Sequence, residues 1–141
     1  MPNTKTMFAM LALAATVTFA GPAFAEKMKA TLDGKSEAPP NTSAGKGTAD
    51  IDYDAASKKL SWKVTYSGLS GPATAAHFHG PAEPGKNAGV AVAIPNASKS
   101  PAEGSATLTD AQAADLEAGK YYVNIHTAAN PGGEIRGQVT K

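Results

Sequence analysis

The chain has 141 residues, of which 42% are hydrophobic and 18% are charged, with 13 basic and 12 acidic side chains. A chain this close to neutrality, without a basic cluster, argues against binding to nucleic acid or to an anionic membrane surface. It contains no cysteine, which excludes disulfides, thiolate metal sites and cysteine nucleophiles. We therefore expect the fold to depend on packing alone, unless a metal ion contributes.

The first 25 residues have the features of a secretory signal peptide. Lys5 supplies a short positive region, residues 7–20 form an apolar run, and Ala23-Phe24-Ala25 is a small-x-small cleavage site. The run is too short to favour a transmembrane helix, and no later segment is long and apolar enough to be one. We expect cleavage after Ala25, one mature domain over residues 26–141 with no membrane contact, and a periplasmic or secreted location.

Short β-rich runs alternate with Gly- and Pro-rich turns along the mature chain, which predicts a sandwich or barrel. The clearest strand is 60–66, in which every second residue is apolar, so one face of its sheet should lie in the core and the other in water. Tyr121 and Tyr122 point to opposite faces of another strand, so one is expected in the core and the other exposed. The other expected strands are 27–32, 47–53, 74–79, 89–94, 104–108, 120–127 and 134–139.

One segment, residues 110–118, has the features of a helix. Thr109 and Gln112 fit a capping box at its start, and Gly119 fits the left-handed position that ends a helix. With the strands above, this predicts an all-β fold: an antiparallel β-sandwich of about eight strands with one short helix.

The three histidines carry the most distinctive chemistry. His77 and His79 lie one residue apart in an expected strand and so point to the same face, while His126 lies in another expected strand. Three imidazoles would suit Cu or Zn and would leave one coordination position open. The alternative is that the histidines are buried and hydrogen-bonded, each supporting a loop.

Four polar residues are candidates for orienting the histidines or for binding a ligand: Glu37, Asn124, Glu134 and Arg136. Glu134 and Arg136 share one face of the last expected strand by alternation. Together they could clamp a carboxylate ligand, since arginine offers a bidentate fork. The alternative, which we favour, is an internal ion pair that ties this strand to the loop carrying Glu37.

Several stretches together resemble the CHRD domain, the module named after the repeats of the animal protein chordin and found also in bacterial secreted proteins. The matching stretches are Leu32-x-Gly34-x-x-Glu37-x-Pro39-Pro40, Ala76-His77-Phe78-His79-Gly80, Leu116-x-x-Gly119-x-Tyr121-Tyr122-Val123-Asn124-Ile125-His126-Thr127 and Asn130-Pro131-Gly132-Gly133-Glu134-Ile135-Arg136-Gly137-Gln138. The resemblance covers essentially the whole mature chain and implies an immunoglobulin-like or superoxide-dismutase-like β-sandwich. It implies little about biochemistry, although chordin itself is an extracellular protein that binds growth factors.

The sequence favours an exported, single-domain binding protein without catalytic activity, and the sharper hypothesis within this class is that His77, His79 and His126 hold Cu or Zn. One alternative is a structural or adhesive module that binds an unidentified protein partner and no metal. A weaker alternative is a mononuclear copper redox enzyme. The two-metal site of copper-zinc superoxide dismutases is excluded, because it uses six histidines and an aspartate and this chain has three histidines.

Overall fold

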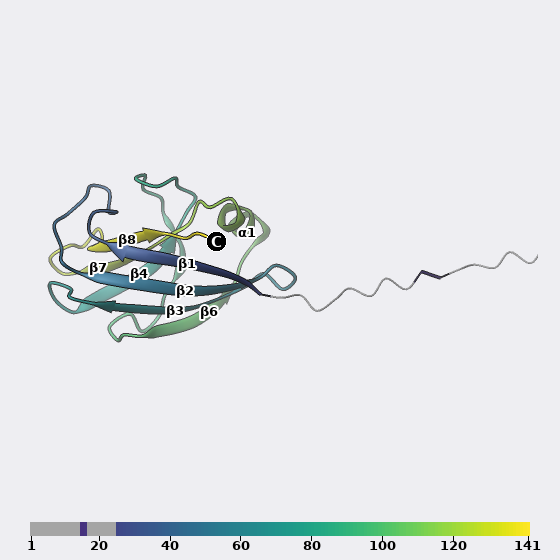
Figure 1. The fold of residues 1–141 in the computed structure, drawn as a ribbon, viewed down its shortest axis with the longest axis horizontal. Coiled ribbons are helices and arrows are strands. Elements are labelled where there is room, and N and C mark those ends of the chain that lie inside the picture. Colours follow the sequence, from purple (N-terminus) through teal and green to yellow (C-terminus); the bar gives the residue numbers. More distant parts are fainter. Residues whose placement is uncertain (1–14, 17–24) are drawn as a thin grey trace, which may run out of the picture.

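The computed structural model describes residues 15–16 and 25–141, which form eight β-strands and one α-helix (Figure 1). The elements are β1 (Glu26–Asp33), β2 (Lys46–Asp54), β3 (Lys59–Ser67), β4 (Ala73–His79), β5 (Val90–Ala93), β6 (Ala102–Thr107), α1 (Asp110–Glu117), β7 (Tyr122–Thr127) and β8 (Ile135–Gln138). Every strand pair is antiparallel, so the expected all-β fold with one short helix is confirmed. The expected signal peptide falls almost entirely outside the described residues. No helix in the described part is long and apolar enough to cross a membrane.

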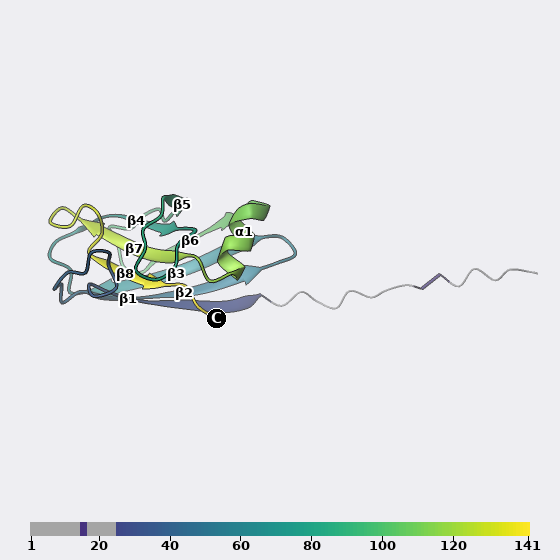
Figure 2. The same ribbon diagram turned by 90° about the horizontal axis from the view of Figure 1, so that it is seen from above.

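The eight strands form one sheet in the order β5-β4-β7-β8-β1-β2-β3-β6, which curls into a near-closed barrel (Figures 1 and 2). We call β5, β4, β7 and β8 the histidine half, and β1, β2, β3 and β6 the solvated half. Pairing between the halves is sparse: β8 meets β1 at Asp33 and Arg136, with an isolated bridge from Lys29 to Thr140. By contrast, β2 pairs with β1 and with β3 along its whole length. The two halves therefore face each other much as the sheets of a sandwich do.

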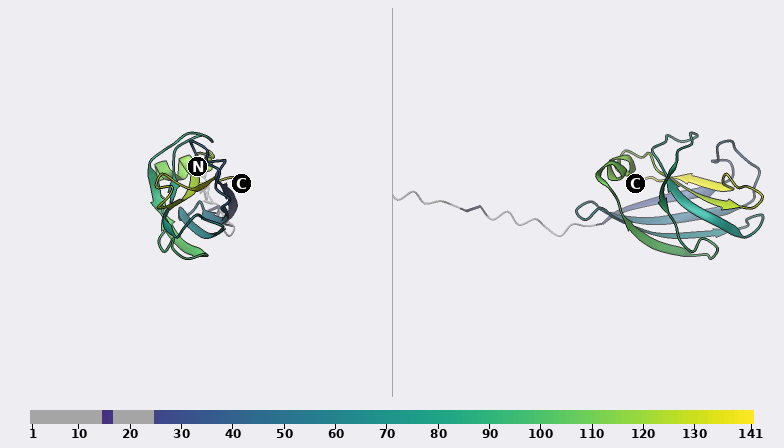
Figure 3. Two further views of the ribbon diagram at one scale, coloured as in Figure 1. Left: turned by 90° about the vertical axis from the view of Figure 1, so that its left-hand side faces the viewer. Right: turned by 180° about the vertical axis from the view of Figure 1, so that it is seen from behind.

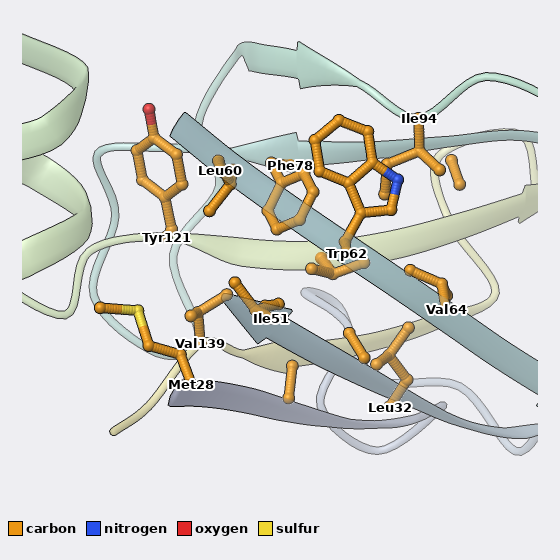
Figure 4. Close-up of a cluster of buried hydrophobic side chains, with 14 of the residues drawn as sticks. Met28, Leu32, Ile51, Leu60, Trp62, Val64, Phe78, Ile94, Tyr121 and Val139 are labelled. Atoms are coloured by element: carbon orange, nitrogen blue, oxygen red, sulfur yellow. The ribbon is translucent and has the colours of Figure 1, made fainter. Parts of the chain in front are cut away.

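The core lies between the inner faces of the two halves (Figure 4). Alternation places one apolar side chain at every second position of β3, and Leu60, Trp62 and Val64 are all buried. Trp62 packs edge-on against Phe78 of β4, with ring centroids 5.2 Å apart and planes at 60°. This contact joins the two halves across the interior, in a geometry that aromatic pairs favour.

The helix closes one end of the barrel (Figure 3). The predicted capping box is present: Thr109 Oγ1 accepts a hydrogen bond from the backbone of Gln112, and Gln112 Oε1 accepts one from the backbone of Thr109. Gly119 follows the helix with a φ of +76°, as expected for its end. Leu116 is buried in the core, so this face of the helix is anchored by packing.

Two loops cover the outer face of the histidine half. Tyr122 lies beneath the loop 80–89, where its hydroxyl donates to the carbonyl of Ala88 at 3.2 Å and accepts from the Ala88 amide at 3.1 Å. From the other side, Asn87 donates to the carbonyl of Ala38 in the loop 34–45. The expectation that either Tyr121 or Tyr122 is exposed is therefore wrong: one is buried in the core and the other under a loop.

Candidate metal centre

Neighbouring strands bring the three histidines together. His77 and His79 point outward from β4, and His126 points outward from β7 beside it. The strand register pairs His77 with Asn124 and Ala75 with His126, so His126 lies diagonally across from His77. Each histidine offers one ring nitrogen, and these nitrogens all lie within 4.8 Å of one another. The three form a group that could hold a metal ion.

One pair of ring nitrogens already has nearly the separation that a metal requires. His77 Nδ1 lies 3.1 Å from His126 Nε2. Ligands at 2.0–2.1 Å from a tetrahedral ion are about 3.3 Å apart. The His79 ring is more distant, with its centroid 5.4 Å from that of His77 and 6.1 Å from that of His126. A movement of up to roughly 1.5 Å by His79 would bring separations of up to 4.8 Å down to that ligand distance.

Backbone carbonyls determine which nitrogen carries the proton in two of these rings. His79 Nδ1 lies 3.0 Å from the carbonyl oxygen of Ala88, and His126 Nδ1 lies 2.8 Å from that of Pro131. A carbonyl can only accept, so Nδ1 donates in both rings and the neutral ring keeps its lone pair on Nε2. Outer hydrogen bonds of this kind orient metal-binding histidines in other proteins.

Burial favours the neutral form of two histidines. It lowers the pKa of His77, and the neighbouring His126 and His79 lower it further. Burial also lowers the pKa of His79, although hydrogen bonds to Ala88 and Asn124 act in the opposite direction. A metal binds the neutral imidazole, so burial favours the coordinating form of these two rings.

Tyr122 and Arg136 extend the cluster along the outer face. The Tyr122 ring stacks on His79, with centroids 4.8 Å apart and planes within 6°. Arg136 Cζ lies 3.4 Å from the centroid of the same ring, and β7 runs between β4 and β8, so the phenol ring lies between the imidazole and the guanidinium group. Tyr122 was missed as a site residue, although strand alternation from His126 and Asn124 could have found it.

Asn124 is the polar candidate that contacts a histidine. Its Oδ1 lies 2.9 Å from His79 Nε2, and its Nδ2 makes a long hydrogen bond of 3.5 Å to the carbonyl of Gly132. The amide is 3% exposed, so water cannot readily replace either partner. Asn124 therefore lies against the nitrogen that His79 would offer to a metal.

Glu37 lies behind Asn124, at the base of the loop 34–45. A Cβ atom at Gly133 would lie 2.5 Å from Glu37 Oε1 and 2.6 Å from Asn124 Nδ2, so both side chains occupy the space beside that glycine. Burial raises the pKa of Glu37 to about 7, although the charge of Arg136 and a backbone hydrogen bond from Ala38 act to lower it. Among the residues that the structure describes, Glu37 Oε1 is buried without a hydrogen-bond partner.

Glu134 lies in a separate polar pocket and does not contact the histidines. The fully buried carboxylate accepts hydrogen bonds from both the backbone and the hydroxyl of Ser70, and from the side chains of Ser43, Thr127 and Asn130 at 2.8–3.0 Å. Burial acts to raise its pKa, but these hydrogen bonds outweigh it and hold the pKa at about 2. The arrangement ties three loops to β7 and β8.

Arg136 forms no ion pair with Glu37 or Glu134 in the described part of the chain, so the expected ion pair is wrong. Its guanidinium group donates to the carbonyl of Lys86 at 2.5 Å and to Asn87 Oδ1 at 3.0 Å. Both terminal nitrogens are thus engaged by the loop 80–89, and the residue is 1% exposed. Arg136 holds that loop over the cluster, which leaves it poorly placed to clamp a carboxylate ligand.

Comparison with known proteins supports the resemblance seen in the sequence. A comparison with curated proteins gave no match, and neither did a comparison with solved structures. The model of one family, the CHRD domain, matches residues 28–139, a span that contains all nine elements of the fold except the first residues of β1. The chain belongs to the CHRD domain family.

Proposed function

We propose that this CHRD protein is exported and binds one Cu or Zn ion through His77, His79 and His126, without catalytic activity of its own. Export is proposed from the signal-peptide features of residues 1–25. The metal site is proposed mainly from one observation: two ring nitrogens, His77 Nδ1 and His126 Nε2, lie 3.1 Å apart. This is close to the separation of two ligands on one metal ion.

The ligand set favours a borderline metal. Three neutral imidazoles suit Zn and Cu, whereas Ca²⁺ and Mg²⁺ prefer oxygen ligands, and the group contains no carboxylate. A three-histidine site on a tetrahedral ion leaves a fourth position for water or a small anion. In the two rings whose Nδ1 atoms donate to Ala88 and Pro131, the lone pair of the neutral ring is on Nε2, which is the nitrogen that can bind a metal.

A structural role without metal is the second candidate, and one observation favours it. The distance of 3.1 Å between His77 and His126 also suits a direct hydrogen bond, in which His77 Nδ1 donates to His126 Nε2. In that case the histidines support the loops 80–89 and 128–134 and need no ion. Such a domain would act as an extracytoplasmic interaction module.

Calorimetric titration with Zn²⁺ and Cu²⁺ separates the two candidates. The protein should be purified without a polyhistidine tag, because the chain has only three histidines of its own. We expect one saturable site per chain, with affinity at least tenfold weaker in His77→Ala, His79→Ala and His126→Ala. Glu103→Ala is the control, since Glu103 is an exposed residue of β6 in the solvated half.

Thermal unfolding gives a second readout of the same site. A metal that binds only the folded protein stabilises it by about 2.7 kcal/mol at a free concentration one hundred times the Kd. That stabilisation should vanish in the three histidine variants and persist in the Glu103 variant. Saturable binding that survives all three histidine substitutions, or no binding at all, would refute the metal site and leave the structural role.

A further inference from the structure

The side-chain amide of Asn124 lies against a nitrogen that the metal would need. His79 donates from Nδ1 to the carbonyl of Ala88, so in the neutral ring Nε2 keeps its lone pair. Asn124 Oδ1 lies 2.9 Å from this Nε2. Two acceptors cannot share a hydrogen bond, whereas an amide N–H in the same place would donate to the lone pair. A half-turn of the amide group supplies that N–H without changing the outline of the side chain.

The surroundings of Asn124 permit this half-turn. The hydrogen bond that the turn gives up, from Nδ2 to the carbonyl of Gly132, is long at 3.5 Å. The amide oxygen would then face the space beside Gly133, where Glu37 Oε1 is buried and has no hydrogen-bond partner within residues 25–141. Glu37 Oε1 and Asn124 Nδ2 make no hydrogen bond as they stand, so a protonated Glu37 donates to the turned amide oxygen only after a shift of its carboxyl group, which would give Oε1 a partner.

We propose that in the metal-free protein Asn124 donates an amide N–H to His79 Nε2, so that Asn124 competes with the metal for this nitrogen, and that Glu37 holds the amide in that orientation. The proposal rests on the metal site proposed above. It assigns Asn124 and Glu37 as positioning residues that weaken metal binding. The opposite role, in which Asn124 orients His79 for the metal, would require the amide to contact a nitrogen that the metal does not use.

Other contacts hold His79 in place when Asn124 is removed. The His79 ring keeps its hydrogen bond to the carbonyl of Ala88 and its stacking on Tyr122. Burial also keeps a protonated Glu37 available near neutral pH, since it raises the pKa of this residue to about 7. Loss of the amide should therefore free the lone pair of His79 and leave the ring ordered.

Metal titration of matched variants at a fixed pH of 7 tests the proposal. We expect Asn124→Ala to bind Zn²⁺ about threefold to tenfold more tightly than the unmodified protein, which corresponds to the loss of one competing hydrogen bond. Asn41→Ala, which removes an amide that contacts no histidine, should leave the affinity unchanged. Glu37→Gln should bind less tightly, because a glutamine at this position always offers a donor to the amide oxygen. Weaker or unchanged binding in Asn124→Ala would overturn the proposal.

Nitrogen NMR of the metal-free protein tests the same contact without any metal. We expect His79 to carry its proton on Nδ1, with Nε2 unprotonated and coupled through a hydrogen bond to the Asn124 amide. A proton on His79 Nε2 would overturn the proposal, whatever the metal affinity. If the expected NMR pattern appears but no variant binds metal, the metal site is refuted while the contact between Asn124 and His79 stands.

Discussion

The outer faces of the two halves of the sheet have similar strand patterns but different surroundings. In the solvated half, the outward side chains of β2 and β3, such as Thr48, Asp50 and Lys63, are exposed. In the histidine half, the corresponding side chains of β7 and β8, such as Tyr122 and Arg136, are buried beneath loops. Both halves alternate along each strand, so alternation defines the faces of a strand and leaves open what covers them.

The difference concentrates polar chemistry on one half. A polar group under a loop has lost contact with water and needs a partner, whereas an exposed one is solvated whether or not it has a neighbour. Arg136, His79 and Glu134 all have such partners within the protein. We therefore expect substitutions of outward polar residues to cost much more in the histidine half than in the solvated half.

The largest effect is expected at Glu134. Glu134→Ala leaves the donors from Ser70, Ser43, Thr127 and Asn130 without their shared acceptor, so the free energy of unfolding should fall by at least about 3 kcal/mol. Urea unfolding at pH 7 measures this loss. A fall below about 1 kcal/mol would show that water replaces the carboxylate in the pocket.

The carboxylate of Glu134 should also make the stability of the fold depend on pH under acidic conditions. The pKa of Glu134 is lowered from 4.5 to about 2 in the folded protein, so its ionised form stabilises the fold above pH 4.5. That stabilisation should be lost as the pH falls from about 4.5 towards 2. The difference in unfolding free energy between the unmodified protein and Glu134→Ala should therefore shrink over this interval. Asp50→Ala, an exposed carboxylate of the solvated half, is the control.

The next largest loss is expected at Arg136, where Arg136→Ala should lower the free energy of unfolding by about 2–3 kcal/mol. The substitution removes the contact with the Tyr122 ring and both hydrogen bonds to the loop 80–89. Hydrogen exchange should also become faster at Ala88 and its neighbours, because the loop loses an anchor. Lys63→Ala removes an exposed base from β3 and should change the unfolding free energy by less than about 0.5 kcal/mol. Equal losses in the two variants would contradict the contrast between the halves.

Substitution of Glu37 should change the unfolding free energy by less than substitution of Arg136. Its pH dependence should be opposite to that of Glu134. Its folded pKa of about 7 lies above the usual 4.5, so the folded protein holds a proton that the unfolded chain releases. Stability should therefore decline as the pH rises from about 4.5 to 7. Glu37→Gln removes that decline and should gain about 2 kcal/mol relative to the unmodified protein between pH 5 and pH 8. An equal change in unfolding free energy for the two proteins between pH 5 and pH 8 would contradict a buried, protonated Glu37.

Local patterns in the sequence were sufficient to predict the elements of the fold. Alternation in 60–66 predicted the buried face of β3, and Thr109, Gln112 and Gly119 predicted both ends of the helix. The separation of His77 and His79 by one residue placed both on one face of β4. These signals are local because helix caps and strand faces depend on neighbours a few residues away.

The surroundings of the site could not be predicted in the same way. Register between β4 and β7 decides whether His126 meets His77, and a shift by one residue would turn it to the core. The loop partners of Arg136 lie about 50 residues away, and two of the partners of Glu134, Ser70 and Ser43, lie 64 and 91 residues away, so no local pattern identifies them. The expected ion pair of Arg136 was wrong for this reason: charge suggested a carboxylate partner, while the fold supplied a backbone carbonyl.

The smallest effect is expected at the surface ion pair of Lys27 and Asp52. The two residues pair across β1 and β2 with Nζ and Oδ1 2.5 Å apart, but the Lys27 side chain is 83% exposed, and within the described part of the chain Asp52 Oδ1 has no aligned hydrogen bond. Exposed pairs gain little because water and salt screen them and ordering a lysine costs entropy. Lys27→Ala should therefore change the unfolding free energy by less than about 0.5 kcal/mol, at both 20 mM and 500 mM salt. A loss comparable to that of Arg136→Ala would mean that the solvated half also depends on its outward charges, and that covering loops do not explain the contrast.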